Sequence, residues 1–233
     1  MTLTTAHWSQ NRGFAGRTVV AITGAGISAA SGLPTISGGF QGRSLKDLFK
    51  LDNARRHVNE YRQLYEEMMF LWLQARPNAA HMALASRGIR VITQNVDGLH
   101  KKAGTREVIE LHGTLAHQRC IACGRRGASL HTVKSETGSF SVGRCGACGS
   151  DLIPDLVLEG EPVRHLALAL NWVTTAQIVI IAGTALEMHP VNQLPLVALR
   201  AHKPVITINE NAEKELPRRL SRQLRSISSL SFQ

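Results

Sequence analysis

The sequence predicts an α/β protein: a doubly wound parallel sheet with a small inserted zinc-binding and helical module. Short apolar runs typical of buried strands alternate with helical segments, at 18–23, 88–92, 107–111, 178–182 and 204–208. Because strands that alternate with helices are usually joined by crossovers, this order favours a parallel sheet. The four cysteines form two Cys-x-x-Cys pairs between residues 120 and 148, which favours a compact metal-binding insert.

The composition is that of an ordinary globular protein, with 233 residues of which 43% are hydrophobic. A formal net charge of +10 is compatible with weak affinity for nucleic acid or another acidic partner. Aromatic residues make up only 5%, which argues against a stacking platform for single-stranded nucleic acid. Neither a signal peptide nor a membrane span is recognisable, so we expect a cytoplasmic protein with reduced cysteines and no membrane partner.

Polar residues follow the predicted strands at the points where they end. The first strand runs into Gly24-Ala25-Gly26-Ile27-Ser28, a glycine turn before a small-residue helix, which suits a phosphate group. Further polar tips lie at 93–97, 183–184 and 209–210. Since the carboxyl ends of parallel strands line one edge of a sheet, these tips predict a dinucleotide site. The alternative at each tip is a turn that caps the next helix.

Two of these tips carry candidate reactive side chains. Gln94 and Asn95 can recognise another amide, and Asp97 can hold a charge or a hydroxyl group. His112 follows the 107–111 strand and can act as a general base near neutral pH, with a structural role as the alternative. We expect His81, on a helix that Asn78 begins, to pack or to cap.

Outside the sheet, the sequence predicts helix from about 45 to 86, with an apolar stripe that favours core packing. The stripe consists of Tyr61, Leu64, Tyr65, Met68, Met69 and Trp72. Near the end of the chain, Arg218, Arg219, Arg222 and Arg225 have the spacing of an exposed basic helix face.

The cysteine pairs, Cys120 with Cys123 and Cys145 with Cys148, predict a tetrahedral zinc site. Four thiolates fill every coordination position, so the zinc is expected to be structural. His117 and His131 are alternative ligands, but the two complete pairs leave them no vacancy.

Together these motifs resemble the sirtuin family, NAD-dependent protein deacylases, as an atypical bacterial-type member, from residue 18 to about 215. The motifs that carry the resemblance are Gly24–Ser28 with Ser31–Pro34, Thr93–His100, His112-Gly113, the cysteine pairs, Gly183–Leu186 with Pro190 and Leu194-Pro195, and Asn209-Glu210. The resemblance implies a Rossmann-like NAD-binding domain over 14–115 and 152–233, with a helical insert at about 38–76. It places the zinc-binding module at 116–151.

The resemblance also implies an activity and a set of roles. The family removes acyl groups from protein lysines and gives nicotinamide and O-acyl-ADP-ribose, with the residue matching His112 as general base and those matching Asn95 and Asp97 beside it. By similarity, NAD would be held by Gly24, Ala25, Gly26, Ser28, Gln94, Asn95, Asp97, Gly183, Thr184, Asn209 and Glu210. The acyl-lysine would meet Val157, Leu158, Glu159 and Gly160.

The sequence departs from the family pattern at two places. Pro34-Thr35-Ile36-Ser37 stands where the family usually has Pro-Asp-Phe-Arg, which leaves an ADP-ribosyltransferase or NAD glycohydrolase as the alternative activity. Glu159 stands where many members have an aromatic residue and would put a charge near the acyl-lysine channel. No Tyr-x-x-Arg follows Tyr61 or Tyr65, which disfavours an acidic acyl group. A third hypothesis, a basic zinc protein that only binds nucleic acid, does not require Asn95, Asp97 and His112.

Overall fold

A computed structural model of the chain describes residues 17–35, 40, 45, 49–50, 65, 67–69, 71–72, 74–129 and 143–228. Of 128–129 and 222–228 only the backbone is described. Within this part of the chain, no helix is long and apolar enough to cross a membrane.

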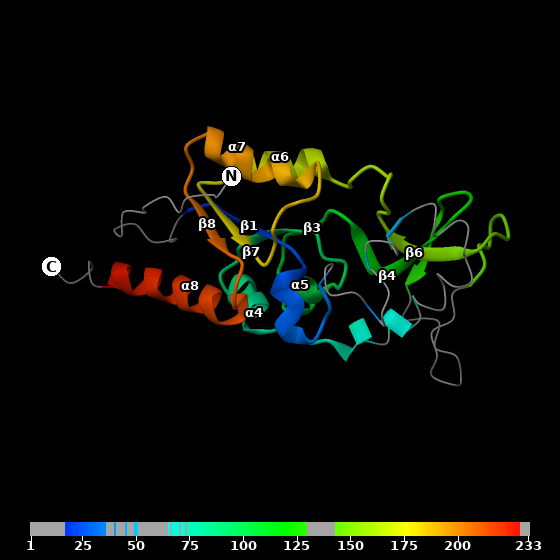
Figure 1. Cartoon of the computed structure of the whole chain (residues 1–233), viewed down its shortest axis with the longest axis horizontal. Coiled ribbons are helices and arrows are strands. Elements are labelled where there is room, and N and C mark those ends of the chain that lie inside the picture. The colour runs from blue at the N-terminus through cyan, green and yellow to red at the C-terminus, as the bar shows by residue number, and fades with distance from the viewer. Residues whose placement is uncertain are drawn as a thin grey trace.

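The larger sheet has five strands in the order β3-β2-β1-β7-β8 (Figure 1). Their bounds are β1 Val19–Thr23, β2 Arg90–Thr93, β3 Val108–Glu110, β7 Ile178–Ala182 and β8 Val205–Ile208. Every neighbouring pair is parallel, as predicted. The chain builds outward from β1 through β2 and β3, and later through β7 and β8 on the other side. The strand order therefore reverses between β1 and β7, and open α/β sheets bind ligands beyond the carboxyl ends of the strands at such a switch point.

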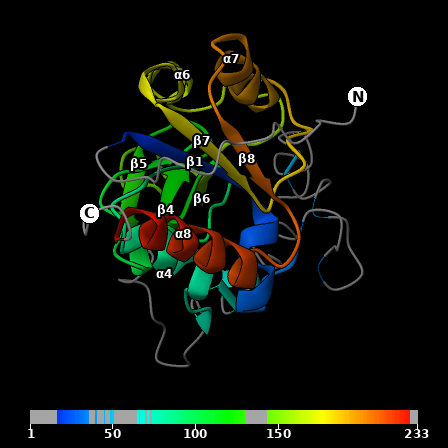
Figure 2. The same cartoon turned by 90° about the vertical axis from the view of Figure 1, so that its left-hand side faces the viewer.

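Helices cover both faces of this sheet. One face packs on α4 (Ala79–Ala85) and α8 (Ala212–Ser228), and the other on α6 (Leu166–Thr175) and α7 (Leu194–Arg200), as Figures 1 and 2 show from two directions. In β1, Val19 and Ala21 belong to the first apolar cluster, while Val20 and Ile22 belong to the second. Since successive side chains of a strand point to opposite faces, an uninterrupted apolar run is what a sheet covered on both sides requires.

The smaller sheet is antiparallel and lies beyond the carboxyl end of the large one (Figure 1). It consists of β5 (Arg126–Ser129), β4 (Gly113–Cys120) and β6 (Leu152–Leu156), in that order. Its core includes Leu115, Ile153 and Leu156, together with Met69 and Trp72 from the predicted helical stripe. The small sheet thus begins at 113 and ends at 156. The division of the chain into domains at 115/116 and 151/152 remains a prediction.

The predicted elements and the observed ones differ mainly at their ends. The small-residue segment after β1 is a 3-10 helix, η1 (Ala25–Ser31), which ends at Gly32 in a left-handed conformation. A short α5 (Leu99–Lys102) follows the 93–98 segment, and the 3-10 helix η3 (Val191–Gln193) leads into α7. Strand β6 ends at Leu156, and the chain then turns at 160–161. Tyr61 and Leu64 of the predicted stripe lie outside the described residues.

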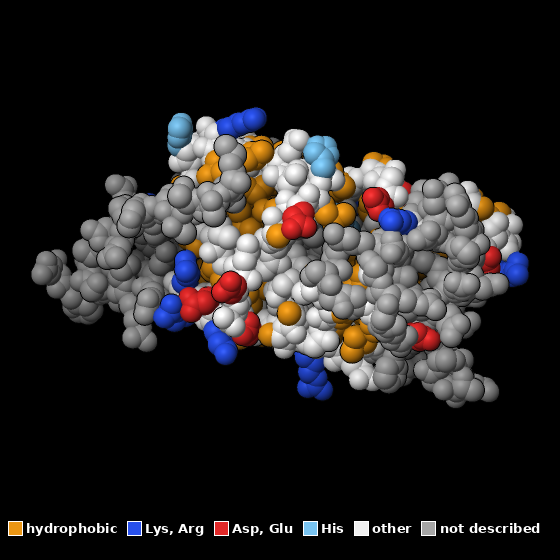
Figure 3. Space-filling model, in the orientation of Figure 1, with side chains coloured by type: hydrophobic (Ala, Val, Ile, Leu, Met, Phe, Trp, Pro, Cys, Tyr) orange, Lys and Arg blue, Asp and Glu red, His pale blue; other side chains and the backbone are white. Residues whose placement is uncertain are grey.

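The predicted basic face of α8 is described only in part. Arg218 lies 2.9 Å and Arg219 3.7 Å from the carboxylate of Glu215. On the molecular face of Figure 3, described basic and acidic side chains gather together at the α8 end. The side chains of Arg222 and Arg225 lie outside the described residues.

Candidate active site

Two glycine turns meet backbone to backbone at the switch point. The amide of Gly26 donates to the carbonyl oxygen of Gly183 over 2.8 Å. A Cβ atom on Gly24 would lie 2.6 Å from the Cβ of Thr184, and one on Gly183 only 2.1 Å from the backbone nitrogen of Ile27. Gly183 also has φ +63°, a left-handed conformation that glycine adopts readily. Both turns therefore require glycine for this close approach at the ends of β1 and β7.

A hydrogen-bonded cluster of three predicted site residues lies next to the first turn. The Ser28 hydroxyl donates to Asp97 Oδ2 over 2.7 Å and accepts from Asn95 Nδ2 over 3.1 Å. Asn95 Nδ2 also donates to the carbonyl oxygen of Gly24, over 3.1 Å. Asp97 Oδ1 accepts from the amide of Leu99, so the same carboxylate caps α5. Asp97 therefore both caps α5 and belongs to the hydrogen-bonded cluster.

A second set of contacts joins the tips of β2, β7 and β8. Gln94 Nε2 donates to Thr184 Oγ1 over 2.8 Å, and the amide of Thr184 donates to Asn209 Oδ1 over 3.2 Å. Glu210 is exposed beside Asn209. The structure thus brings the predicted cofactor residues from four separate strand ends into one region.

His112 is fixed by contacts on both its ring and its backbone. Nδ1 lies 3.0 Å from the carbonyl oxygen of Gln94. Because a carbonyl oxygen can only accept, Nδ1 carries the proton and Nε2 keeps its lone pair. Burial lowers the pKa of His112, and the hydrogen bond to Gln94 partly opposes this. A neutral imidazole with an unprotonated Nε2 has the form that a general base needs.

A pair of buried histidines, His81 and His100, packs next to the cluster. His81 Nδ1 accepts from the amide of Asn78 in a capping box, which confirms the predicted packing and capping role. Its Nε2 therefore carries the proton and faces the Ser28 hydroxyl at 3.4 Å. His100 Nε2 lies 2.9 Å from Thr23 Oγ1, and the two imidazole rings are 4.8 Å apart. Sequence reasoning missed this contact with Ser28, although the Pro77-Asn78 helix start already placed a histidine at the third helical position.

The predicted substrate residues follow β6 directly. The amide of Val157 donates to the carbonyl oxygen of His112 over 2.8 Å. Leu158 is only 1% exposed and packs in the core of the small sheet, so its side chain is not available to a ligand. Glu159 and Gly160 are exposed, and the amide of Glu159 donates to the carbonyl oxygen of Phe49 over 2.6 Å. Leu158 can therefore offer only its backbone to a substrate, whereas the Glu159 side chain remains accessible.

The four cysteines converge at the end of the small sheet, with all four sulfur atoms within 4.8 Å of one another. Cys120 and Cys148 Sγ are 3.4 Å apart, and Cys123 and Cys145 Sγ are 3.7 Å apart. Sulfur atoms around a tetrahedral zinc ion with Zn–S of about 2.3 Å would be separated by about 3.8 Å. The cluster therefore fits a structural zinc ion.

Comparison with known proteins decides the family. The Sir2 family model matches residues 24–190, which includes both glycine turns, His112 and all four cysteines. The chain belongs to the Sir2 family. Its relatives include an NAD-dependent protein deacetylase of Sulfolobus acidocaldarius, 38% identical over 197 residues, covering 82% of this chain and 78% of the relative. An NAD-dependent protein deacylase of Thermococcus kodakarensis is 36% identical over 213 residues, covering 83% and 80%.

Solved structures of Sir2 proteins have the same fold as this chain. A Sir2 homologue in complex with NAD has a TM-score of 0.78 at 30% identity, covering 91% of this chain and 90% of that one. Sir2Tm bound to a propionylated peptide has a TM-score of 0.76 at 30% identity, covering 90% and 94%. The Rossmann-like sheet with a small zinc-binding module predicted for this Sir2 chain is confirmed. Of the departure at Thr35-Ile36-Ser37, Ile36 and Ser37 lie outside the described residues, as does His131.

Proposed function

We propose that this Sir2 chain is an NAD-dependent protein-lysine deacylase that removes acetyl or another neutral acyl group. Its products are the free lysine, nicotinamide and O-acyl-ADP-ribose. The observation that carries this proposal is the neutral His112, whose Nδ1 is bound to Gln94 so that Nε2 is left to take a proton. A protein that only bound NAD or nucleic acid would not need a histidine held in this form.

The residues at the switch point fit NAD. Gly24, Ala25, Gly26 and Ser28 would hold phosphate and ribose groups, since a glycine turn before a helix lets an anion approach the backbone. The amides of Gly24 and Gly26 are themselves bonded to the carbonyl oxygens of Ala182 and Gly183. Gln94, Asn95 and Asp97 would form the nicotinamide and ribose pocket. Gly183, Thr184, Asn209 and Glu210 would take phosphate and adenosine. When bound, NAD supplies the ADP-ribosyl group that accepts the acyl group.

In the reaction, His112 Nε2 would take a proton from a ribose hydroxyl group. Burial helps this role because it keeps the imidazole neutral at physiological pH. Asn95 and Asp97 would orient the reacting sugar, and their own positions are fixed through Ser28. The buried Thr23, His81 and His100 beneath them exclude water from this side of the cluster.

The acylated lysine of a protein substrate would lie along 157–160, next to His112. The hydrogen bond from Val157 to the His112 carbonyl keeps this segment beside the base. The exposed carboxylate of Glu159 adds a negative charge to the segment, which opposes an acidic acyl group and agrees with the preference for neutral groups.

Mass spectrometry of NAD products, with and without a panel of acyl-lysine peptides, tests the proposal. We expect nicotinamide and O-acyl-ADP-ribose only when a neutral acyl peptide is present, and neither product with His112→Ala. Free ADP-ribose, or ADP-ribose attached to protein without any acyl substrate, would instead support the NAD glycohydrolase or ADP-ribosyltransferase alternative.

Two further expectations stay part of this proposal. A cytoplasmic location suits the cysteine cluster, because zinc needs thiolates that a reducing compartment preserves. Weak nucleic-acid affinity rests on the net charge of +10 alone. Titration of a DNA duplex at several salt concentrations tests it, since such binding weakens steeply with salt.

A further inference from the structure

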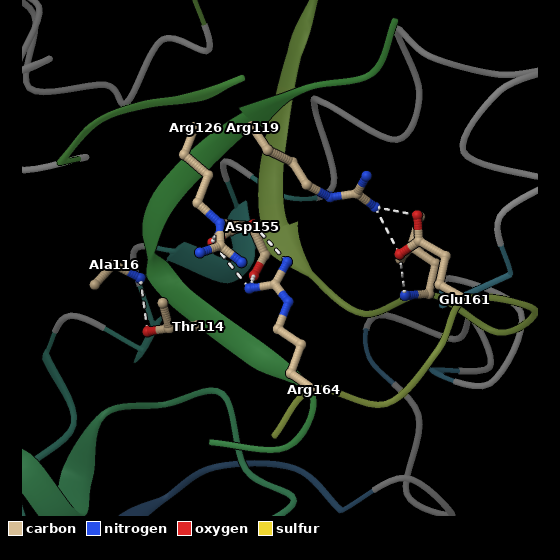
Figure 4. A network of polar contacts seen from close by, with 8 residues as sticks. Thr114, Ala116, Arg119, Arg126, Asp155, Glu161 and Arg164 are labelled. Atoms are coloured by element: carbon tan, nitrogen blue, oxygen red, sulfur yellow. Dashed lines mark hydrogen bonds and ion pairs between the residues drawn. The ribbon is translucent and has the colours of Figure 1, made fainter. Parts of the chain in front are cut away.

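An ion pair that involves none of the proposed NAD residues closes the 158–161 turn of the proposed substrate segment. Arg119 Nη2 donates to both carboxylate oxygens of Glu161, over 2.7 and 2.8 Å (Figure 4). Glu161 Oε2 accepts from the amide of Leu158 over 3.0 Å, and the Glu161 amide donates to the Leu158 carbonyl oxygen over 2.9 Å. Glu161 thus binds both the amide and the carbonyl of Leu158, which closes the 158–161 turn, and Arg119 holds its carboxylate.

The two partners come from different elements of the small sheet region. Arg119 lies on β4 immediately before Cys120, opposite Ile153 of β6. The side chains of Arg119 and Glu161 are 14% and 21% exposed, so the pair is partly shielded from solvent. Arg119 Nε is buried without a hydrogen-bond partner in the described part of the chain. The guanidinium therefore has Glu161 as the partner that fixes its orientation.

A neighbouring group of ion pairs, also shown in Figure 4, fixes a residue of β6 and not the turn. Arg164 holds the buried Asp155 with two hydrogen bonds, of 2.9 and 2.6 Å, and Arg126 reaches the same carboxylate at 3.2 Å. Arg126 is 63% exposed and adds to a carboxylate that Arg164 already satisfies. Asp155 lies within β6, whereas Glu161 lies in the turn beyond it. Of the three arginines, Arg119 is the one that contacts the substrate turn.

From this geometry we infer that Arg119 is a positioning residue for the acyl-lysine segment. Through Glu161 it fixes the backbone of 158–160, which would bind the acylated peptide. The inference rests on the proposed deacylase function for its substrate. It assigns Arg119 a role in peptide binding, separate from NAD binding and from proton transfer at His112.

Kinetics on the full chain test the assignment, with NAD and an acetyl-lysine peptide and the variants R119Q, R119K and R126Q. We expect R119Q to raise the KM for the peptide about tenfold, the low end for losing a charge-assisted hydrogen bond that is partly exposed. We expect the KM for NAD to stay within about twofold, since the pair involves none of the proposed NAD residues. R119K keeps the charge but loses the fork geometry, so its peptide KM should lie between the two. R126Q is the matched control and should resemble the wild type.

A double-mutant cycle with E161Q separates the pair from other effects of Arg119. If the two side chains act together, R119Q/E161Q should cost less than the product of the single fold-changes. Zinc content and melting temperature, measured for every variant, identify a variant that has failed to fold. A peptide KM unchanged in a folded R119Q variant overturns the assignment. So does an equal rise in R126Q, or a KM for NAD that rises in parallel.

Amide hydrogen exchange of residues 157–161 gives a readout that does not depend on activity. We expect faster exchange of this segment in R119Q and unchanged exchange in R126Q, because the Leu158 amide loses its fixed acceptor. Unchanged exchange in R119Q refutes the inference. A wild-type protein that turns over no acyl peptide, but whose R119Q variant shows the faster exchange, refutes the deacylase function and leaves the role of Arg119 in the turn.

Discussion

Acidification should destabilise this protein through His100, which is 2% exposed and packed against His81. Burial lowers the pKa of His100 from 6.5 to about 3, and the neighbouring His81 adds to this. Between these two values the unfolded chain binds a proton that the folded chain does not. The contribution of His100 to the free energy of unfolding is therefore fully present above pH 6.5 and is lost as the pH drops towards 3.

The size of the effect follows from the two pKa values. On going from pH 7.5 to pH 5.5, protonation of His100 in the unfolded chain should remove about 1.4 kcal/mol from the free energy of unfolding. The assay is urea denaturation at both pH values for the wild type and for His100→Asn, which cannot titrate in this range. The variant will be less stable at pH 7.5, but we expect its loss on acidification to be smaller by about 1.4 kcal/mol.

Comparing the change in the free energy of unfolding between the wild type and His100→Asn cancels the pH-dependent contributions that both proteins share. Release of zinc as thiolates protonate, and the titration of His81, whose pKa burial also lowers, affect both chains. Replacing the exposed His202 with Asn is the matched control and should leave the wild-type pH dependence in place. Equal losses on acidification in the wild type and His100→Asn would refute the argument that His100 is held neutral by burial.

Three other outcomes are expected. Gly183→Ala places a methyl group 2.1 Å from the backbone nitrogen of Ile27 at φ +63°, so NAD affinity measured by calorimetry should fall at least about tenfold. Unchanged affinity contradicts a role of the two glycine turns in NAD binding. Chelation of zinc should unfold the small sheet and abolish peptide turnover, seen as loss of the cooperative thermal transition and restored by added zinc; a chelator-resistant transition argues against a structural metal. Asp155→Asn leaves the Arg164 guanidinium short of a charge and should cost about 3 kcal/mol in chemical denaturation. A loss below 1 kcal/mol means that this pair is dispensable.

The sequence was most informative where one kind of force determined the local structure. The run Ile178–Ala182 is apolar throughout, and it forms a fully buried strand with the predicted bounds. The cysteines were equally predictable, because metal ligation fixes both residue type and spacing. The strand tips followed from the fold class, since parallel strands bring Ser28, Asn95 and Thr184 to one edge of the sheet.

What the sequence could not supply were contacts between elements distant in the chain. His81 was expected to cap its own helix and does so, but its second nitrogen faces Ser28, 53 residues away. Leu158 was grouped with the substrate residues from its motif, yet its side chain lies in the core, in the same apolar cluster as Ile153 and Leu156. The Arg119–Glu161 pair spans 42 residues, and no local pattern marks it.

The bond between the Val157 amide and the His112 carbonyl oxygen has a consequence for how this site can change. The proposed proton acceptor and the first residue of the proposed substrate segment are neighbours in one backbone ladder, so their spacing is set by main-chain atoms that no side-chain replacement alters. If the proposed roles hold, substitutions at Glu159 should alter which acylated lysines are accepted while His112 keeps its place. In this architecture substrate choice and proton transfer can diverge independently.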